Sequence, residues 1–429
     1  MSTAVTSSSG MPGTRPDPNA AGGAGRAWLA NRWARWGMLA LGGLLVLSTL
    51  RVVTGANDLD SSGAIAAAFG LAVPIALAGL GGLWSERAGV VNIGLEGMMI
   101  LGTWSSAFCA FHWGPWVGLL GGALGGMVGG LIHAIATVYF GVDHIVSGVA
   151  LNIIGLGVAK YLASRFFAEL PGGGPTQSPP LPSPPRLSIP GIGDPLLTLE
   201  RKHIFLVSDL AGIVRGLTIN VSVLTLITLG LFVATWWILW RTAFGLRLRS
   251  VGESPVAAES LGVNVYRYKF LAVLASGFFA GLGGAFLTMV ASNLFRDGQT
   301  SGRGYIGLAA MIFGNWRPGG LLAGSALFGF TDATRLRGGT GVHATLLLVA
   351  VLMLLMGLWQ LFRRRRVLQG IVSIAFAGLA AWWYFGSDSV PGELASTLPY
   401  VTTLLVLAFA AQRLRMPAAD GQIYRKGGH

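Results

Sequence analysis

The chain has 429 residues, of which 53% are hydrophobic and only 11% are charged. A soluble domain usually carries about 25% charged residues, so most of this chain has no aqueous surface to face, which excludes an ordinary soluble protein. The formal net charge of +13 does not indicate nucleic-acid binding, because the Lys and Arg residues lie in short clusters beside apolar segments. That pattern is typical of charges that set membrane topology.

We predict an all-α polytopic membrane protein with roughly 10–12 transmembrane helices, because the apolar segments have the length that crosses about 30 Å of hydrocarbon. Residues 1–36, rich in Ser, Gly, Pro and Ala, are predicted to be a disordered cytoplasmic tail. The expected spans lie near residues 37–54, 63–83, 94–111, 115–140, 143–167, 219–240, 270–291, 304–316, 318–336, 342–362, 368–386 and 397–413.

Alternate crossing places residues 168–218 outside and residues 241–269 in the cytoplasm. The outer segment contains PGGGPTQSPPLPSPP, which is expected to be extended, and PLLTLERKHIFLVSDL, which is predicted to form a short surface helix. Residues 363–429 are predicted to form a C-terminal membrane hairpin and a cytoplasmic tail, since Arg363 to Arg366 are a strong cytoplasmic signal. Both termini are therefore expected inside, in a multi-pass protein of the inner membrane.

Two distant segments read alike. NIGLEGMMILGTW covers residues 92–104 and YIGLAAMIFGNW covers residues 305–316. By the topology above they enter the membrane from opposite sides, which is the relation that an internal inverted repeat requires. Chance similarity between two Gly- and Leu-rich membrane segments is the alternative.

Short, glycine-interrupted segments in corresponding halves indicate a substrate path at their interface, because a broken helix exposes backbone donors. We therefore predict a translocation path that contains Asn92, Gly94, Glu96, Gly307 and Asn315. Glu96 has a second interpretation, since a carboxylate is also favourable in the first turn of a helix.

No catalytic residue and no metal site are predicted. The single cysteine, Cys109, excludes an intramolecular disulfide and a cysteine metal cluster, and the six His are scattered. No Ser-His-Asp or paired-carboxylate arrangement is visible.

A short helix is predicted inside the cytoplasmic loop. Ser254 suits the N-cap, Pro255 suits the first helical position and Gly262 suits the residue after the end. The intervening VAAESL gives about two turns, too short to be stable alone. Such a helix fits docking into a groove of a partner, although an ordinary interfacial loop helix has the same pattern.

The loop RTAFGLRLRSVGESPVAAESLGVNVYRYK resembles the coupling loop of permease subunits in the branched-chain amino acid and simple-sugar superfamily of bacterial ABC importers. Two further stretches, ERAGVVNIGLEGMM at 86–99 and SGRGYIGLAAMIFGNWRPGG at 301–320, also resemble it, over roughly residues 61–340. The resemblance implies that residues 37–362 are the permease domain. The residues it assigns to ATPase coupling are Glu253, Ser254, Pro255, Ala258 and Gly262, with Arg247 and Arg249 flanking them.

The resemblance implies three protein partners: a cytoplasmic ABC ATPase, a second homologous permease and an external substrate-binding lipoprotein. Membrane lipids are expected around the chain, and no nucleic acid. No lysine follows a glycine, so the phosphate loop GxxxxGK[ST] is absent from the sequence. ATP and Mg are thus expected on the partner, with no cofactor and no enzymatic activity in this chain.

The coupling loop is most similar to the nucleoside-uptake branch, which implies a nucleoside as the solute; a simple sugar is the alternative. Trp84, Trp104 and Trp316 could stack on a nucleobase, but membrane aromatics also serve as packing or interfacial anchors. An ion-coupled secondary transporter remains a rival, and it would need a relay built from the few acids in the apolar segments, chiefly Glu96, Asp143 and Asp332.

Overall fold

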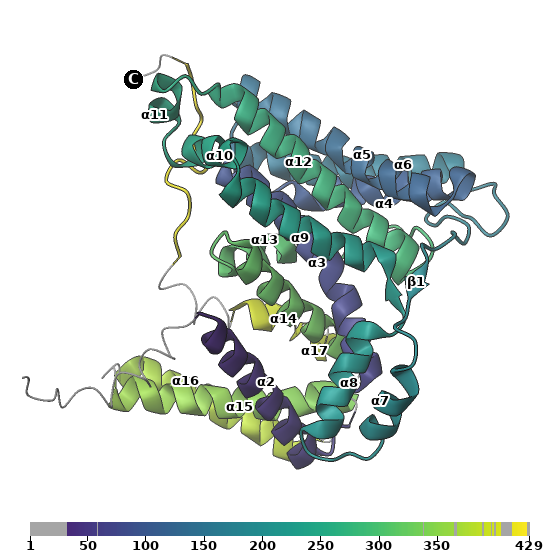
Figure 1. Ribbon diagram of the computed structural model, residues 1–429, viewed down its shortest axis with the longest axis vertical. Helices are drawn as coiled ribbons and strands as arrows, with labels where there is room; N and C mark the ends of the chain where they lie inside the picture. The colour runs from purple at the N-terminus through teal and green to yellow at the C-terminus, as the bar shows by residue number, and fades with distance from the viewer. Residues whose placement is uncertain are drawn as a thin grey trace, which may run out of the picture.

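The computed structural model describes residues 32–426 except 58, 338, 364–366, 388–389, 396, 399 and 405–413 (Figure 1). The described part is helical apart from loops and one pair of two-residue strands, which confirms the all-α prediction. The helices are α2 (Arg32–Thr54), α3 (Ser62–Arg87), α4 (Leu95–Trp113), α5 (Pro115–Ala134), α6 (His144–Phe166), α7 (Gly193–Glu200), α8 (Val207–Thr218), α9 (Val223–Arg241), α10 (Ala243–Glu253), α11 (Pro255–Ser260), α12 (Val265–Phe286), α13 (Arg303–Phe313), α14 (Pro318–Arg337), α15 (Gly339–Phe362), α16 (Val367–Gly386) and α17 (Gly392–Ala395).

Two helices continue as π-helical turns, α5 into η1 (Ile135–Tyr139) and α12 into η2 (Leu287–Ala291). Among the described residues, seven helices are long and apolar enough to cross a membrane, and two shorter apolar helices accompany them. Each of the first eleven expected spans coincides with a helix. The twelfth, residues 397–413, lies largely outside the described residues, as does most of the predicted N-terminal tail.

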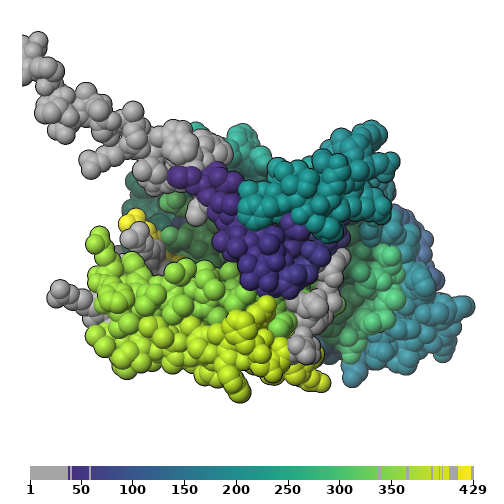
Figure 2. Space-filling view, turned by 90° about the horizontal axis from the view of Figure 1, so that it is seen from below, coloured from purple at the N-terminus to yellow at the C-terminus, as the bar shows by residue number. Residues whose placement is uncertain are grey.

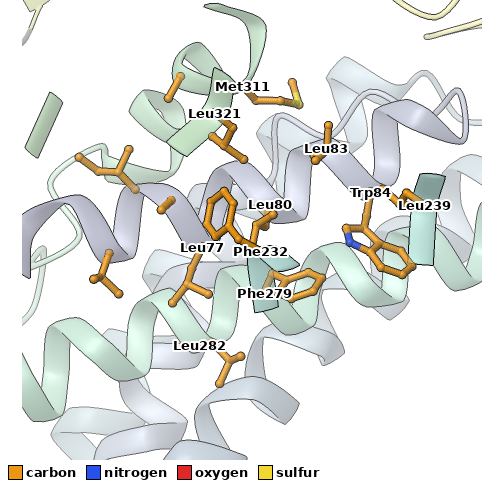
Figure 3. Close-up of a cluster of buried hydrophobic side chains, with 14 of the residues drawn as sticks. Leu77, Leu80, Leu83, Trp84, Phe232, Leu239, Phe279, Leu282, Met311 and Leu321 are labelled. Atoms are coloured by element: carbon orange, nitrogen blue, oxygen red, sulfur yellow. The ribbon is translucent and has the colours of Figure 1, made fainter. Parts of the chain in front are cut away.

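Helix α3 is the centre of the molecule and is buried along most of its length. Its apolar side chains pack with those of α9, α12, α13 and α14, and Trp84 lies beside Phe279 in this cluster (Figure 3). The described members of the surrounding core include Leu77, Leu80 and Leu83, none of which has exposed surface. A continuous apolar helix of this kind, hydrophobic on all sides, is expected only where every side has a neighbour.

Glycine brings three helices into backbone contact. A Cβ on Gly102 of α4 would lie 2.5 Å from the Cα of Gly281 in α12, and a Cβ on Gly126 of α5 would lie equally close to the same atom. No real Cβ tolerates such a distance, so both positions require glycine in this packing. Small residues allow membrane helices to approach in this way, and here they fuse α4, α5 and α12 into one packed unit.

The two similar segments run in opposite directions, as the inverted repeat predicts. Neighbouring pairs show that α12 is antiparallel to α3 and parallel to α4, whereas α13 is parallel to α3. These pairs are Gly81 with Ser276, Pro74 with Gly283, Met99 with Gly283, Thr103 with Thr288, Gly307 with Ile75 and Met311 with Gly82. Helices α4 and α13 are therefore antiparallel, which raises the likeness of their sequences above chance.

The Pro-rich segment is not helical, as predicted, and it pairs with the loop between η2 and α13. Ser178 N donates to Phe295 O at 3.1 Å and Leu181 N donates to Asn293 O at 2.8 Å. The end of the segment forms β1 (Arg186–Leu187), which is antiparallel to β2 (Val221–Ser222). The segment thus covers the loop that leads into α13.

The predicted surface helix is two helices, α7 and α8. Leu206, between them, has a left-handed φ of 64°, and Asp209 in the first turn of α8 accepts from its N–H, so the chain turns there instead of continuing. Helix α8 lies against α3, since a Cβ on Gly216 would be 2.7 Å from Ser62 O. Figure 2 shows α2 (purple) between α7 and α8 (teal) on one side and the hairpin of α15 and α16 (yellow-green) on the other.

A buried ion cluster joins α2, α8 and the loop before α3. The Nε of Arg51 lies 2.7 Å from Asp209 Oδ1 and 3.4 Å from Asp60 Oδ2, and all three side chains are at most 5% exposed. Ser48 donates a hydrogen bond to the Asp209 carboxylate. One guanidinium serves two carboxyls, and burial, together with the neighbouring Asp209, raises the pKa of Asp60 to about 8.

This cluster makes the stability of the fold depend on pH. Because the pKa of Asp60 is raised, the folded protein holds a proton that the unfolded chain releases near pH 3.8. Stability should therefore fall as pH rises through the window that ends near 8, and level off above it. Thermal unfolding of the detergent-solubilised protein between pH 6 and 9 measures this slope. The isosteric Asp60→Asn variant should make this slope shallower; an unchanged slope in that variant would assign the titration to another group.

The described C-terminal part is built on the pair of α15 and α16. Helix α16 packs against α15, where a Cβ on Gly357 would lie 2.6 Å from Ile374 Cγ1 and 2.9 Å from Gly370 O. The apolar contact of α15 with α2 passes through Ala344 and Leu50. The predicted pairing of 368–386 with 397–413 cannot be followed, since residues 405–413 lie outside the described part.

Candidate functional site: the α10–α11 loop and the α4–α13 junction

The loop between α9 and α12 is more ordered than its sequence suggested. Its first half, for which no helix was predicted, is the helix α10. Thr242 is its N-cap, with a side chain that accepts from Gly245 N at 3.2 Å. This threonine is the signal that could have predicted the helix, since it precedes a stretch in which Gly245, Leu248 and Val251 form one buried face.

The second half contains the predicted short helix, α11. Pro255 occupies the first helical position, and Gly262 follows the end with a left-handed φ of +79°. Gly262 N donates to Glu259 O and Val263 N to Ala258 O, the pair of bonds that closes a Schellman motif. Two details of the prediction are wrong: the helix ends at Ser260 instead of 261, and Ser254 makes no side-chain cap bond although it stands at the N-cap position.

One side of α11 is held and the other is free. Ala258 is 2% exposed and packs in a cluster with Val251 and Val265. On the outward side, Val256 is 51% exposed and Leu261 is 84% exposed. Exposed apolar side chains beside a glycine stop, on a helix too short to be stable alone, fit a surface that a partner protein covers.

The charged residues assigned to this loop differ in their surroundings. Arg247 is exposed on α10. Arg249 is anchored: its Nε donates to Leu239 O at 2.9 Å and its guanidinium lies 5.5 Å from the centroid of the Trp240 ring. The exposed carboxylate of Glu253 lies 4.0 Å from Arg87, the last residue of α3. The loop is thus tied at its base to α9 and α3.

The second part of the site is the junction where α4 and α13 begin. Glu96, in the first turn of α4, is 7% exposed, and its carboxylate accepts from Gly302 N at 2.9 Å and from Gly304 N at 2.7 Å. Those two N–H groups belong to the start of α13. One carboxylate therefore serves the positive ends of two opposed helices, the placement that helix dipoles favour.

Asn92 and Gly94 lie next to this junction. The Asn92 amide is fully buried; its Nδ2 donates to Ser276 Oγ at 2.8 Å and its Oδ1 accepts from Gly94 N at 3.0 Å. A Cβ on Gly94 would lie 3.0 Å from Leu151 of α6. These bonds hold the entry into α4, and a role of either residue in the translocation path stays a prediction.

Asn152 of α6 completes the junction and was not among the predicted path residues. Its Oδ1 accepts from Gly97 N at 2.7 Å, while its Nδ2 donates to Ile93 O at 3.0 Å and to the Tyr305 hydroxyl at 2.7 Å. The signal was an asparagine in the middle of an apolar span, where an unsatisfied amide is costly. Tyr305 is 46% exposed, so this polar group faces out of the packed interior.

The structure separates the remaining two path residues from the junction. Gly307 lies against α3, where a Cβ would be 2.7 Å from Ile75 O. Asn315 follows the far end of α13 and accepts from Arg415 N at 2.8 Å. Asn92, Gly94 and Glu96 are thus brought together, whereas Asn315 lies one helix length away.

The acids that an ion relay would need have structural partners. Asp332 is bound by Arg303 at 2.6 Å and by Arg335 at 2.8 Å. Asp143 caps α6, accepting from Ile145 N at 2.9 Å. Within the described ranges no group of three His, Cys, Asp or Glu side chains is placed to hold a metal ion.

Two of the three tryptophans considered for nucleobase stacking are used in packing. Trp84 is 8% exposed and donates to Thr235 Oγ1 at 3.1 Å. Trp316 is 3% exposed and its Nε1 donates to Glu86 Oε2 at 2.6 Å. Trp104 is half-buried and stacks on Phe108 in an aromatic cluster beside α6.

A cavity of about 390 Å³ opens between α3, η2 and the start of α9. Its walls are mainly apolar, with Arg186, Asn220, Ser222 and Thr225 as polar members. The size falls in the range of small-molecule sites. None of the predicted path residues lines it.

Comparison with known proteins gives a consistent result. The family described as "Branched-chain amino acid transport system / permease component" matches residues 64–357. The guanosine ABC transporter permease protein NupQ of Bacillus subtilis (strain 168) is 33% identical over 364 residues, which cover 83% of this chain and 94% of NupQ. The nucleoside ABC transporter permease protein NupC of Lactococcus lactis subsp. cremoris (strain MG1363) is 34% identical over 360 residues, 82% of this chain and 93% of NupC.

The putative glucose ABC transporter permease protein TsgC13 of Haloferax volcanii is 30% identical over 372 residues, which cover 85% of this chain and 98% of TsgC13. No solved structure matches.

Proposed function

The chain belongs to the branched-chain amino acid transport permease family, and from this premise we propose that it is the membrane subunit of an ABC importer that carries nucleosides. It is a multi-pass membrane protein whose relatives are transport components. A separate ATPase supplies the energy, and ATP and Mg bind there. Both chain termini, by this proposal, lie in the cytoplasm of a bacterial cell.

The observation that carries the proposal is the geometry of α11. The helix is stopped at both ends by Pro255 and Gly262, buried at Ala258 and open at Val256 and Leu261. An enclosed loop helix would bury those two apolar side chains. If a groove of the ATPase binds Val256 and Leu261, closure of the nucleotide sites would displace α11.

The displacement of α11 would be transmitted to the membrane-spanning part through α3. Arg87, at the end of α3, faces Glu253 and also donates from Nε to Trp316 O at 2.9 Å, just beyond α13. Displacement of α11 therefore acts on the ends of α3 and α13 together. The far end of α13 is bound to α4 by Glu96, so the junction of the two repeats receives the motion.

A nucleoside is the favoured solute because two of the relatives with the highest identity are named for guanosine or nucleoside transport. A sugar remains the second candidate, supported by the likeness to the putative glucose permease TsgC13. The surroundings of the acidic residues argue against ion coupling. The carboxylates of Glu96 and Asp143 accept hydrogen bonds from backbone N–H groups, and that of Asp332 forms an ion pair with Arg303.

A second permease and an external receptor complete the proposed transporter. Helix α6 presents a broad apolar face, with Val146, Ile153 and Tyr161 each more than 60% exposed. Lipid or a homologous subunit would cover such a face. The external receptor would deliver the solute on the side that carries α7 and α8.

An ABC importer and an ion-coupled secondary transporter differ in their energy source: the first uses ATP and the second an ion gradient. We expect vesicles that contain this chain with its ATPase, second permease and receptor to accumulate labelled guanosine when ATP is supplied. A protonophore should not reduce this uptake. Glucose serves as the competing solute. Uptake that collapses with the protonophore but persists without ATP would overturn the importer, and preferential uptake of glucose would move the solute to the sugar class.

A further inference from the structure

Residues 414–426, here called the C-terminal strap, cross the face of the molecule that carries α10 and α11 (Figure 1, yellow). The strap lies outside residues 64–357, the part that matches the permease family. It has no regular secondary structure, yet it is bound to α10, α11, α12, the loop after α3 and the end of α13. Those contacts are the basis of the inference.

The first contacts are with α10 and α11. Ala419 N donates to Gly252 O at 2.9 Å, and Ala418 N donates to Glu253 Oε2 at 3.3 Å. The Tyr424 hydroxyl donates to Glu259 Oε2 at 2.5 Å, and its ring packs on the apolar cluster that buries Ala258. The strap therefore forms much of the inner support of α11.

The next contacts are with the loop after α3 and the start of α12. Lys269 is 3% exposed, and its Nζ donates to Gly89 O at 3.1 Å and to Gln422 O at 3.3 Å. One buried ammonium group thus joins the strap to that loop. Gly89 has a φ of +78°, and a Cβ there would approach Ala419 O to 3.1 Å.

Asp420 is the buried acid of the strap, 8% exposed. Its carboxyl faces Glu86, with Lys269 and Arg87 as the positive neighbours. Burial, the largest effect, raises the pKa of Asp420 to about 7. A carboxyl that is partly protonated can lie beside Glu86 without leaving two full charges opposed.

The last contact is with α13. Arg415 N donates to the Asn315 side chain at 2.8 Å, and Leu414 packs at the edge of the main core. The strap thus begins at the end of one repeat segment, passes α10, and ends under α11. A single stretch of backbone spans the parts that must move together.

We propose that the C-terminal strap positions the coupling helix α11 for the ATPase and links it to the cytoplasmic ends of α3 and α13. This inference rests on the proposed function for the identity of the partner. The physical reason is that a six-residue helix cannot hold its own conformation. The strap supplies the missing contacts on the inner side and leaves Val256 and Leu261 open for the ATPase.

Removal of the strap tests the proposal directly. A chain that ends at residue 413 is compared with the full chain, without the ATPase for the mobility of a label and in the assembled transporter for ATPase binding. In both, Cys109→Ala removes the native thiol and Ala257→Cys on the exposed side of α11 carries a nitroxide label. We expect the label to become mobile in the shortened chain, and ATPase binding to weaken at least roughly tenfold, because several hydrogen bonds and the Tyr424 packing are lost. An immobile label with ATPase binding unchanged would overturn the proposal.

Point variants keep the test valid if the shortened chain does not fold. Tyr424→Phe removes only the hydroxyl that donates to Glu259, and Tyr424→Ala also removes the packing. Tyr161→Phe, on the exposed face of α6, is the matched control. Graded label mobility, Ala above Phe above wild type with the control unchanged, supports the strap; equal mobility in all four contradicts it.

The label separates this inference from the proposed function. If the full chain binds no ATPase, the importer assignment fails, while label mobility still reports whether the strap holds α11. If the full chain binds ATPase and the shortened chain binds it equally well, the importer assignment stands and the strap has no part in the docking surface.

Discussion

Ala258→Pro is expected to abolish ATP-driven uptake while the protein still inserts and folds. Ala258 N donates to Ser254 O at 3.0 Å, the first intrahelical bond of α11, and its side chain is buried under the strap. Proline removes that donor and clashes with the preceding turn, at a cost of about 3 kcal/mol. That is about a hundredfold in any equilibrium that requires the helix. Uptake in vesicles and the rate of ATP hydrolysis, measured together, report the uncoupling.

The matched control is Ala257→Pro, one residue earlier. Position 257 is exposed and lies in the first turn, where the N–H has no acceptor within the helix. Its uptake should stay much closer to wild type. Normal uptake in Ala258→Pro, or equal loss in both variants, would mean that an intact α11 is not what couples hydrolysis to transport.

Glu96→Ala is expected to destabilise the fold more than any other single change at the junction of α4 and α13. It leaves the N–H groups of Gly302 and Gly304 without their acceptor in a buried site, at a cost of about 1–3 kcal/mol for each. The total, about 2–6 kcal/mol, should appear as a lower thermal unfolding temperature in detergent. Uptake should fall with it, because the start of α13 loses its anchor.

Two comparisons make the result specific. Glu96→Gln keeps one acceptor oxygen, so it should lie between Glu96→Ala and wild type. Glu169→Ala removes an exposed carboxylate beyond α6 and should leave unfolding unchanged. If Glu96→Ala unfolds at the wild-type temperature but loses transport, the carboxylate contacts the solute and its structural role is minor.

Much of the helical framework could be predicted because membrane helices can be recognised in a sequence by their length and apolar content. The short helix α11 was also predictable, since Pro255 and Gly262 have few other uses at that spacing. Helix α10 was missed because Arg247 and Arg249 suggested a hydrophilic loop. Arg249, whose guanidinium lies 5.5 Å from the centroid of the Trp240 ring, shows that such an arginine can belong to a helix that lies on the bundle.

The candidate site was only partly predictable. The repeat led to the antiparallel pair of α4 and α13, which the helix contacts confirm. It also led to Glu96, which lies at their junction, while its place in a translocation path stays a prediction. The repeat could not show how far Asn315 lies from Glu96, because matching two sequences does not give positions along the membrane normal. Glu96 contacts the start of α13, whereas Asn315 follows the end of that helix. The strap could not be foreseen either, since its hydrogen bonds to the rest of the molecule join residues at least 100 positions apart.

The shared contact at Gly281 has a consequence for how access alternates. Three backbones touch there without side chains between them, so α4, α5 and α12 have no layer that could shear or repack. Gating by movement of one helix inside the subunit would open voids that nothing could fill. We therefore expect α4, α5 and α12 to move as one body, so that access alternates where this unit meets α13 at the Glu96 contact and not between the three helices themselves.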